Sequence, residues 1–337
     1  MPAETAQGGG MPWKEQQGER DRRSASTLDL MARAARLHYE FGLTHEEAAE
    51  ALSLSRVKVT RLLKQARELG IVKITITTDA RPFGELEERL VGDFGLTEAI
   101  VVPYGNGTED GLRSVLAQGA ASYLIRVVRD DLVVAVGLSR TIAKIPKWLD
   151  NPRRARATFV SLVGALRIGG AGSGNPYQAT DAFATAFGGI AEHLHAPVIV
   201  RSAEVAEELR RDPGIAQTLE HAAAADVAFA GVGGRDDRIS FAQGADISAA
   251  EWDELLGAGM VGDVGARFFD RDGLSIDHDI SRRVIGLSLD LFKKIPNRVV
   301  AAGGPTKTEP LEAALRGGII TVLVTDASTA RSLLKLG

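Results

Sequence analysis

The chain has 337 residues, of which 45% are hydrophobic and 25% charged, and its formal net charge is −4. It contains no cysteine, which excludes disulfides and thiolate metal sites, and its six scattered histidines show no metal-binding spacing, so we expect no metal and no cofactor. The apolar runs fall well short of the roughly 20 residues that cross a membrane, and no signal segment opens the chain, so we expect a cytoplasmic protein without a membrane partner.

The composition along the chain predicts a tail and two domains. Residues 1–26 are rich in glycine and charge and lack an apolar period, so we expect them to be disordered. Residues 27–80 show helical periodicity followed by a short strand over 71–76, and Pro82 and Gly84 mark a joint before a larger domain at 85–337. The first part, over 27–76, has eight Lys and Arg against six Asp and Glu, whereas residues 80–337 have 28 against 33. A surface that binds nucleic acid must therefore be local.

Two helices joined by a tight turn are predicted within residues 44–70. Thr44 and Glu47 have the spacing of a capping box, so a helix should begin there and end near Leu52. Ser55 is a second N-cap after the turn, and the next helix should run from Arg56 to about residue 69 and close at Gly70. This arrangement is a helix-turn-helix.

The second helix has one apolar and one basic face. The apolar arc, which should pack on the preceding helices, consists of Val59, Leu62, Leu63, Ala66 and Leu69. The opposite face is basic, since residues 55–67 hold five basic residues and no acidic one, which suits phosphate contact and entry into the major groove. Its candidate DNA-binding residues are Ser55, Arg56, Val57, Lys58, Thr60, Arg61 and Lys64. The alternative is an ordinary solvated face of a helical pair.

The larger part alternates β-rich runs with helical patterns. Strands are expected at 99–104, 132–137, 158–164, 198–200, 227–232, 284–287, 299–302 and 320–325. Such alternation predicts an α/β domain with a mostly parallel sheet and helices on both faces. Ligands bind at the carboxyl ends of parallel strands, and Gly137 and Gly231 end two of these runs, so both are candidate effector-binding residues.

Polar residues after the strands supply further candidates. Gly137-Leu138-Ser139-Arg140-Thr141 follows a strand and opens a helix, where amides, the Ser139 and Thr141 hydroxyls and the Arg140 guanidinium can meet an anion. The alternative is a plain strand-to-helix turn. Asp270 and Asp272 could accept sugar hydroxyls or act as an acid/base pair, or they form an Asp-rich turn that ends at Gly273. His278 is expected to be solvated.

Four stretches resemble the SorC family of sugar-responsive regulators over residues 27–337. They are GLTHEEAAEALSLSRVKVTRLLKQARELGIVKI, VAVGLSRTIAKI, AGMVGDVGARFFDRDG with the following RRVIGLSL, and VVAAGGPTKTEPLEAALRGGIITVLVTD. The resemblance implies an effector domain similar to sugar-phosphate isomerases, assembly into dimers or tetramers, and binding of sugars, polyols or their phosphates. It also implies that Lys307, at the start of a helix, and Asn175 are candidate effector-binding residues. The alternative for Lys307 is a solvated lysine. The chain departs from the family pattern at Ser53 and Ser139, where glycines are usual.

The resemblance and the helix-turn-helix together predict a function. We expect a DNA-binding regulator of carbohydrate metabolism, and not an enzyme, whose affinity for double-stranded operator DNA depends on a small carbohydrate or phosphorylated carbohydrate. The alternative is a sugar-phosphate isomerase-like enzyme, since the implied fold also occurs in isomerases. The attached helix-turn-helix favours the regulator, because an isomerase has no need of it.

Overall fold

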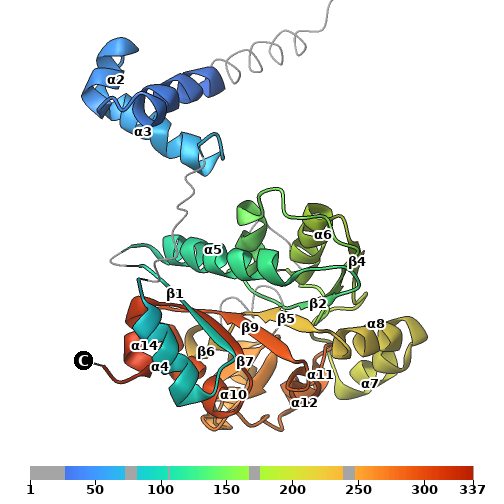
Figure 1. Ribbon diagram of the computed structural model, residues 1–337. Coiled ribbons are helices and arrows are strands. Elements are labelled where there is room, and N and C mark those ends of the chain that lie inside the picture. The colour runs from blue at the N-terminus through green and yellow to red at the C-terminus, as the bar shows by residue number, and fades with distance from the viewer. Residues whose placement is uncertain (1–26, 73–81, 105–106, 167–174, 238–246, 337) are drawn as a thin grey trace, which may run out of the picture. The chain divides into compact units, whose positions relative to one another are not determined.

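The computed structural model describes residues 27–72, 82–104, 107–166, 175–237 and 247–336 (Figure 1). The chain divides into two compact units, Met1–Ala80 and Arg81–Gly337. The tail expected at 1–26 and most of the strand expected at 71–76 lie outside the described residues, and Ile71 and Val72 form bends.

The first unit is helical. Residues 27–35 form a helix that continues into the π-helical turn η1 (Arg36–Glu40), followed by α2 (His45–Ala51) and α3 (Arg56–Glu68). The Thr44 side chain accepts from the Glu47 amide while Glu47 reaches back to the Thr44 amide, and the Ser55 hydroxyl accepts from the Lys58 amide at 3.3 Å. Both predicted helix starts are confirmed, because they depend on caps that are local in sequence.

A small core joins these helices. The buried members from α3 are Val59, Leu62, Leu63 and Ala66, and those from the earlier helices are Met31, Ala34, Ala35, Ala48 and Ala49. The expectation for Leu69 is wrong, since its side chain is 61% exposed. Helix α3 ends at Glu68, and Gly70 turns the chain with a φ of +73°, so Leu69 leaves the apolar arc.

The turn between α2 and α3 contains a backbone that favours glycine. Ser53 has a φ of +53°, in the left-handed region that a Cβ atom disfavours. Ser53→Gly relieves this backbone strain, but glycine also gains conformational entropy in the unfolded chain, which opposes part of the gain. We therefore expect a net stabilisation of the first unit by up to about 1 kcal/mol. Native-state hydrogen exchange of the α3 core amides measures this change. Ser53→Ala keeps the Cβ and should give no gain, so an equal effect of both variants would contradict the explanation.

The second unit is built on a seven-stranded parallel sheet in the order β1-β10-β9-β5-β2-β3-β4. Its strands are β1 (Glu98–Val102), β2 (Val133–Val136), β3 (Thr158–Ser161), β4 (Ile190–Glu192), β5 (Val227–Ala230), β9 (Asn297–Ala301) and β10 (Val322–Asp326). A second, antiparallel sheet contains β6 (Gly233–Gly234), β7 (Gly262–Val264) and β8 (Arg267–Phe269). The predicted α/β fold with a mostly parallel sheet is confirmed.

Two expected strands are replaced by isolated bridges. Residues 198–200 and 284–287 form only single bridges, between Ile199 and Val284 and between Val163 and Gly286, both antiparallel. Their apolar side chains are buried in loops beside the sheet, which a short β-rich run cannot reveal. Strand β4 and the antiparallel sheet were not expected.

Helices cover both faces of the parallel sheet (Figure 1). They are α4 (Gly84–Phe94), α5 (Glu109–Val127), α6 (Pro176–Phe187), α7 (Ala203–Arg211), α8 (Pro213–Ala223), α10 (Ala249–Gly257), α11 (Asp279–Arg283), α12 (Leu289–Phe292), α13 (Thr308–Arg316) and α14 (Ala327–Leu333), with 3₁₀ turns η2 (Ile142–Trp148), η3 (Arg235–Asp237) and η4 (Pro305–Lys307). Alternate strand residues enter the two cores: Val134 and Val136 pack with α5 and α6, and Ala135 packs on the opposite face. Among the described residues, no helix has both the length and the apolar character of a membrane span.

Candidate functional site

A cavity of about 870 Å³ lies at the carboxyl edge of the parallel sheet. Its lining comes from the segments that follow β2, β5, β9 and β10 and from the region where α5 begins. Parallel strands bring their carboxyl ends to one edge, so segments far apart in the sequence converge there. The arrangement is typical of a small-molecule site.

Most of the predicted effector residues line this cavity. Ser139, Arg140, Thr141, Gly231 and Lys307 are all part of the lining. The Ser139 hydroxyl accepts from the amides of residues 141 and 142, at 3.1 and 3.3 Å, so it caps the turn that begins η2.

Close packing explains two glycines at this edge. A Cβ on Gly231 would lie 2.5 Å from the Ser139 hydroxyl oxygen, so the smaller residue lets these two segments approach. Gly137 is not among the lining residues; a Cβ there would meet the Phe229 carbonyl oxygen at 3.1 Å, which gives it a packing role.

Asn175 and Asp270 are not among the lining residues either. The Asn175 side chain accepts from the Tyr177 amide at 3.2 Å and caps α6. Asp270 accepts from the amides of Asp272 and Leu274, both at 2.9 Å, and Gly273 has a φ of +71°. These contacts match the Asp-rich turn given as the alternative for Asp270, and they give Asn175 a local capping role.

Asp237, which the sequence reasoning missed, lies between two of the predicted cations. Its carboxylate accepts a hydrogen bond from the Lys307 ammonium, pairs with Arg140 at 3.3 Å, and accepts from the Gly234 amide at 2.8 Å. Burial raises the pKa of Asp237, but Lys307, the Gly234 amide and Arg140 together outweigh it, so the net pKa is lowered. Asp237 is therefore a charged anion inside the cavity. The only sequence signal was an Asp-Asp pair six residues after β5.

Asp263 is a second missed carboxylate in the lining. It lies on β7, is 4% exposed, and accepts from the Ala266 amide at 3.0 Å. Burial raises the pKa of Asp263 to about 7, and the nearby charge of Asp237 adds to the effect. Near neutral pH the group can thus donate or accept a hydrogen bond, which suits a ligand hydroxyl. A Cβ on Gly233 would lie 1.8 Å from its Oδ1, so glycine is required opposite it.

A glycine pair positions Lys307. Gly304, with a φ of +95°, donates from its amide to Asp326 at 2.9 Å and to Thr329 at 2.8 Å. A Cβ on Gly303 would lie 2.3 Å from an Asp326 oxygen. The buried Asp326 thus holds the turn between β9 and η4, and η4 ends at Lys307 on the cavity.

The predicted DNA-binding face of α3 is exposed. Its residues Ser55, Arg56, Val57, Lys58, Thr60, Arg61 and Lys64 are all solvent-accessible. Val57 is 79% exposed. Arg56 pairs with Glu46 of α2 at 3.7 Å, and the Thr60 hydroxyl lies 3.1 Å from the His45 ring. A basic face with an exposed aliphatic residue is well suited to a major groove.

Comparisons with known proteins cover both the helical first unit and the α/β second unit. Residues 82–335 match the Sugar-bind family, described as "Putative sugar-binding domain". The chain is 32% identical over 311 residues to the transcriptional regulator LsrR of Klebsiella pneumoniae, covering 91% of this chain and 93% of that one. It is 29% identical over 329 residues to the uncharacterized transcriptional regulator YjhU of Escherichia coli, covering 94% and 98%.

Solved structures have the same fold. A domain from Vibrio fischeri described as "Putative Sugar-Binding Domain of Transcriptional Repressor" matches with a TM-score of 0.70 at 30% identity, covering 75% of this chain and 98% of that one. The full-length sorbitol operon regulator SorC of Klebsiella pneumoniae matches with a TM-score of 0.72 at 24% identity, covering 91% and 98%, which shows the shared fold. The chain belongs to the SorC family of sugar-binding transcriptional regulators.

Proposed function

We propose that this regulator binds a small carbohydrate or phosphorylated carbohydrate in the cavity of about 870 Å³, and that occupancy changes its affinity for operator DNA. The observation that supports this most directly is the chemistry of the lining. Hydroxyls, carboxylates and three cationic side chains converge there, and these are the groups that bind sugar hydroxyls and phosphates.

The regulator is favoured over an isomerase-like enzyme by its relatives and by its first unit. The relatives named above are transcriptional regulators, and α2 and α3 have the arrangement of a helix-turn-helix. We further propose that the chain acts as a dimer or tetramer, because helix-turn-helix proteins commonly bind two half-sites together.

A thermal-shift screen of sugars, polyols and their phosphates tests the effector assignment. A ligand that binds only the folded state raises the unfolding midpoint. Each compound that does so should then be assayed for turnover and for its effect on operator binding. Turnover without any effect on operator binding would favour the isomerase-like enzyme over the regulator.

We expect Arg56→Ala and Arg61→Ala each to weaken operator binding, because both side chains lie on the exposed face of α3. Loss of a bidentate base contact should cost about 1–3 kcal/mol and relax preference at one base pair, whereas loss of a phosphate contact should weaken all sequences alike. Fluorescence anisotropy with operator and random DNA at fixed salt separates the two cases.

A matched control for these variants is Arg316→Ala in the second unit, where Arg316 pairs with Glu312. It makes the same change in net charge at a residue outside the helix-turn-helix unit. If it weakens operator binding as much as the α3 variants do, the effect comes from net charge and the assigned DNA-binding face is wrong.

A further inference from the structure

We propose that Asp237 is a built-in competitor of the effector: its carboxylate occupies the cation pair formed by Arg140 and Lys307, and an anionic group of the effector binds by displacing it. The inference rests on the proposed function, because it takes the cavity to be the effector site. It adds a mechanism by which the chain sets its own affinity.

The contacts of Asp237 resemble those of a bound anion. One carboxylate oxygen faces the Arg140 guanidinium at 3.3 Å, and the other accepts from the Lys307 ammonium and the Gly234 amide. Two cations and a backbone amide are the groups that typically bind a phosphate or carboxylate ligand. Asp237 thus fills the place that a ligand anion would take.

The remaining cavity cation is also paired. Within the described lining, the cationic side chains are Arg113, Arg140 and Lys307. Arg113 pairs with Glu109 one helical turn earlier on α5, and the other two pair with Asp237. An anionic ligand at the Arg140 and Lys307 pair therefore competes with a carboxylate of the chain itself for the strongest cation contacts.

Asp237 is placed so that it can be displaced. It is the last residue of the three-residue turn η3, and within the described residues its polar contacts are the two cations and one amide already described. The charge of Asp237 also contributes to the raised pKa of Asp263, so the two carboxylates repel each other.

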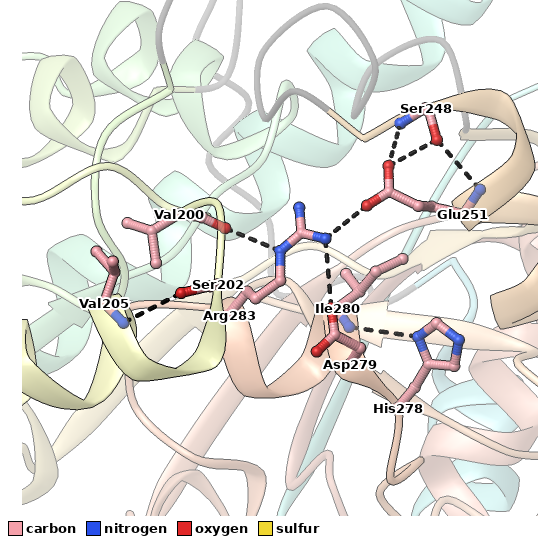
Figure 2. Close-up of polar contacts among 9 residues, drawn as sticks. All are labelled: Val200, Ser202, Val205, Ser248, Glu251, His278, Asp279, Ile280 and Arg283. Atoms are coloured by element: carbon pink, nitrogen blue, oxygen red, sulfur yellow. Dashed lines mark hydrogen bonds and ion pairs between the residues drawn. The ribbon is translucent and has the colours of Figure 1, made fainter.

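A tryptophan lies next to this turn and offers an optical signal. The Trp252 indole of α10 donates to the carbonyl of Arg235, two residues before Asp237, at 3.3 Å. Helix α10 is also anchored through Glu251, the residue before Trp252 (Figure 2): Glu251 pairs with the buried Arg283, which also donates to the Val200 carbonyl at 2.8 Å. A change at η3 should therefore alter the surroundings of the indole while α10 stays fixed.

The test measures binding of inorganic phosphate by calorimetry to the full chain and to Asp237→Asn. If Asp237 occupies the cation pair nine-tenths of the time, its removal should raise the apparent phosphate affinity by about tenfold. Asp236→Asn is the matched control, since Asp236 lines the same cavity and the substitution removes the same charge. We expect that control to change the phosphate affinity less than about twofold, because it only removes one negative charge whose effect is screened by salt.

Trp252 fluorescence provides the second measurement, in a background where Trp13 and Trp148 are replaced by phenylalanine. Phosphate should shift the emission of the chain with Asp237 and leave that of Asp237→Asn nearly unchanged, because no carboxylate remains to be displaced. Asp237→Ala serves if the asparagine variant folds poorly.

Three results would overturn the proposal. The first is an equal gain in phosphate affinity with Asp236→Asn, which would mean that net charge alone causes the effect. The second is unchanged or weaker phosphate binding by Asp237→Asn, which would make Asp237 a ligand contact, and the third is no phosphate binding by any variant. The last result leaves the proposed function standing if a neutral sugar or polyol still raises the unfolding midpoint and changes operator binding. If no carbohydrate raises the unfolding midpoint and changes operator binding, the proposed function itself is overturned.

Discussion

Replacing Asp263 by asparagine is expected to raise the free energy of unfolding of the second unit by about 4 kcal/mol at pH 8. The carboxyl is fully buried and its pKa is raised from 3.8 to about 7, so above pH 7 the folded chain must hold a charge that the unfolded chain leaves in water. Asparagine keeps the acceptor for the Ala266 amide and removes the charge. Each unit by which burial raises the pKa of Asp263 corresponds to about 1.4 kcal/mol of lost stability once the group is charged.

The sign of the pH dependence follows from the direction of this shift. Between pH 3.8 and about 7 the folded chain binds the Asp263 proton more tightly than the unfolded chain does, so the contribution of Asp263 to stability falls as the pH rises. Below that window Asp263 is protonated in both states, and above it the deficit is constant. The advantage of Asp263→Asn should therefore be small near pH 4, grow through the window, and level off above pH 7.

Calorimetric unfolding of both proteins between pH 4 and 8 measures this difference. Asp253→Asn, at an exposed position on α10, is the control and should change the unfolding free energy little at any pH. A difference that does not vary with pH, or that shrinks as the pH rises, would contradict the burial of a charge at Asp263.

Lys307→Ala is expected to weaken binding of an anionic effector by roughly 30- to 150-fold, equivalent to about 2–3 kcal/mol. The substitution removes one of the two cations that contact Asp237 and leaves that carboxylate with Arg140 and one amide. The other acids of the lining, Glu109, Asp236, Asp263 and Asp326, then dominate the cavity. Binding of an anion is opposed both by the lost contact and by this negative charge.

Operator binding by the effector-free Lys307→Ala protein should stay within about twofold of the unmodified chain, because the lysine is assigned to the effector and not to DNA. Binding at two coupled sites is reciprocal, with typical coupling of about 1–3 kcal/mol, so saturating effector should shift operator affinity by roughly 5- to 150-fold in the unmodified chain. In Lys307→Ala the same shift should require far more effector.

Fluorescence anisotropy on a labelled operator, titrated with an effector from the thermal-shift screen, measures both quantities. Lys335→Ala, at a 77% exposed lysine, is the matched control. Full effector affinity in Lys307→Ala would place the effector elsewhere. An effector that binds tightly yet leaves operator affinity and oligomeric state unchanged would favour the isomerase-like enzyme, and turnover of that compound should then be assayed.

The sequence by itself determined the features that depend on neighbouring residues. The starts of α2 and α3 follow from caps within three positions of Thr44 and Ser55, and the parallel strands follow from apolar runs that alternate with helices. The residues that follow strand ends, such as Ser139 and Lys307, were also found, because in a parallel sheet those ends share one edge.

Only the tertiary structure decided which charges meet at that edge. Asp237 lies 70 positions before Lys307 along the chain, and they come together because β5 and β9 are neighbours in the sheet. Asp263 is opposite Gly233 through an antiparallel pairing that no local pattern indicated. Its raised pKa comes from burial, which is a property of everything packed around it. Local patterns specify elements and their ends, whereas pairings and burial between distant segments arise only when the whole chain packs.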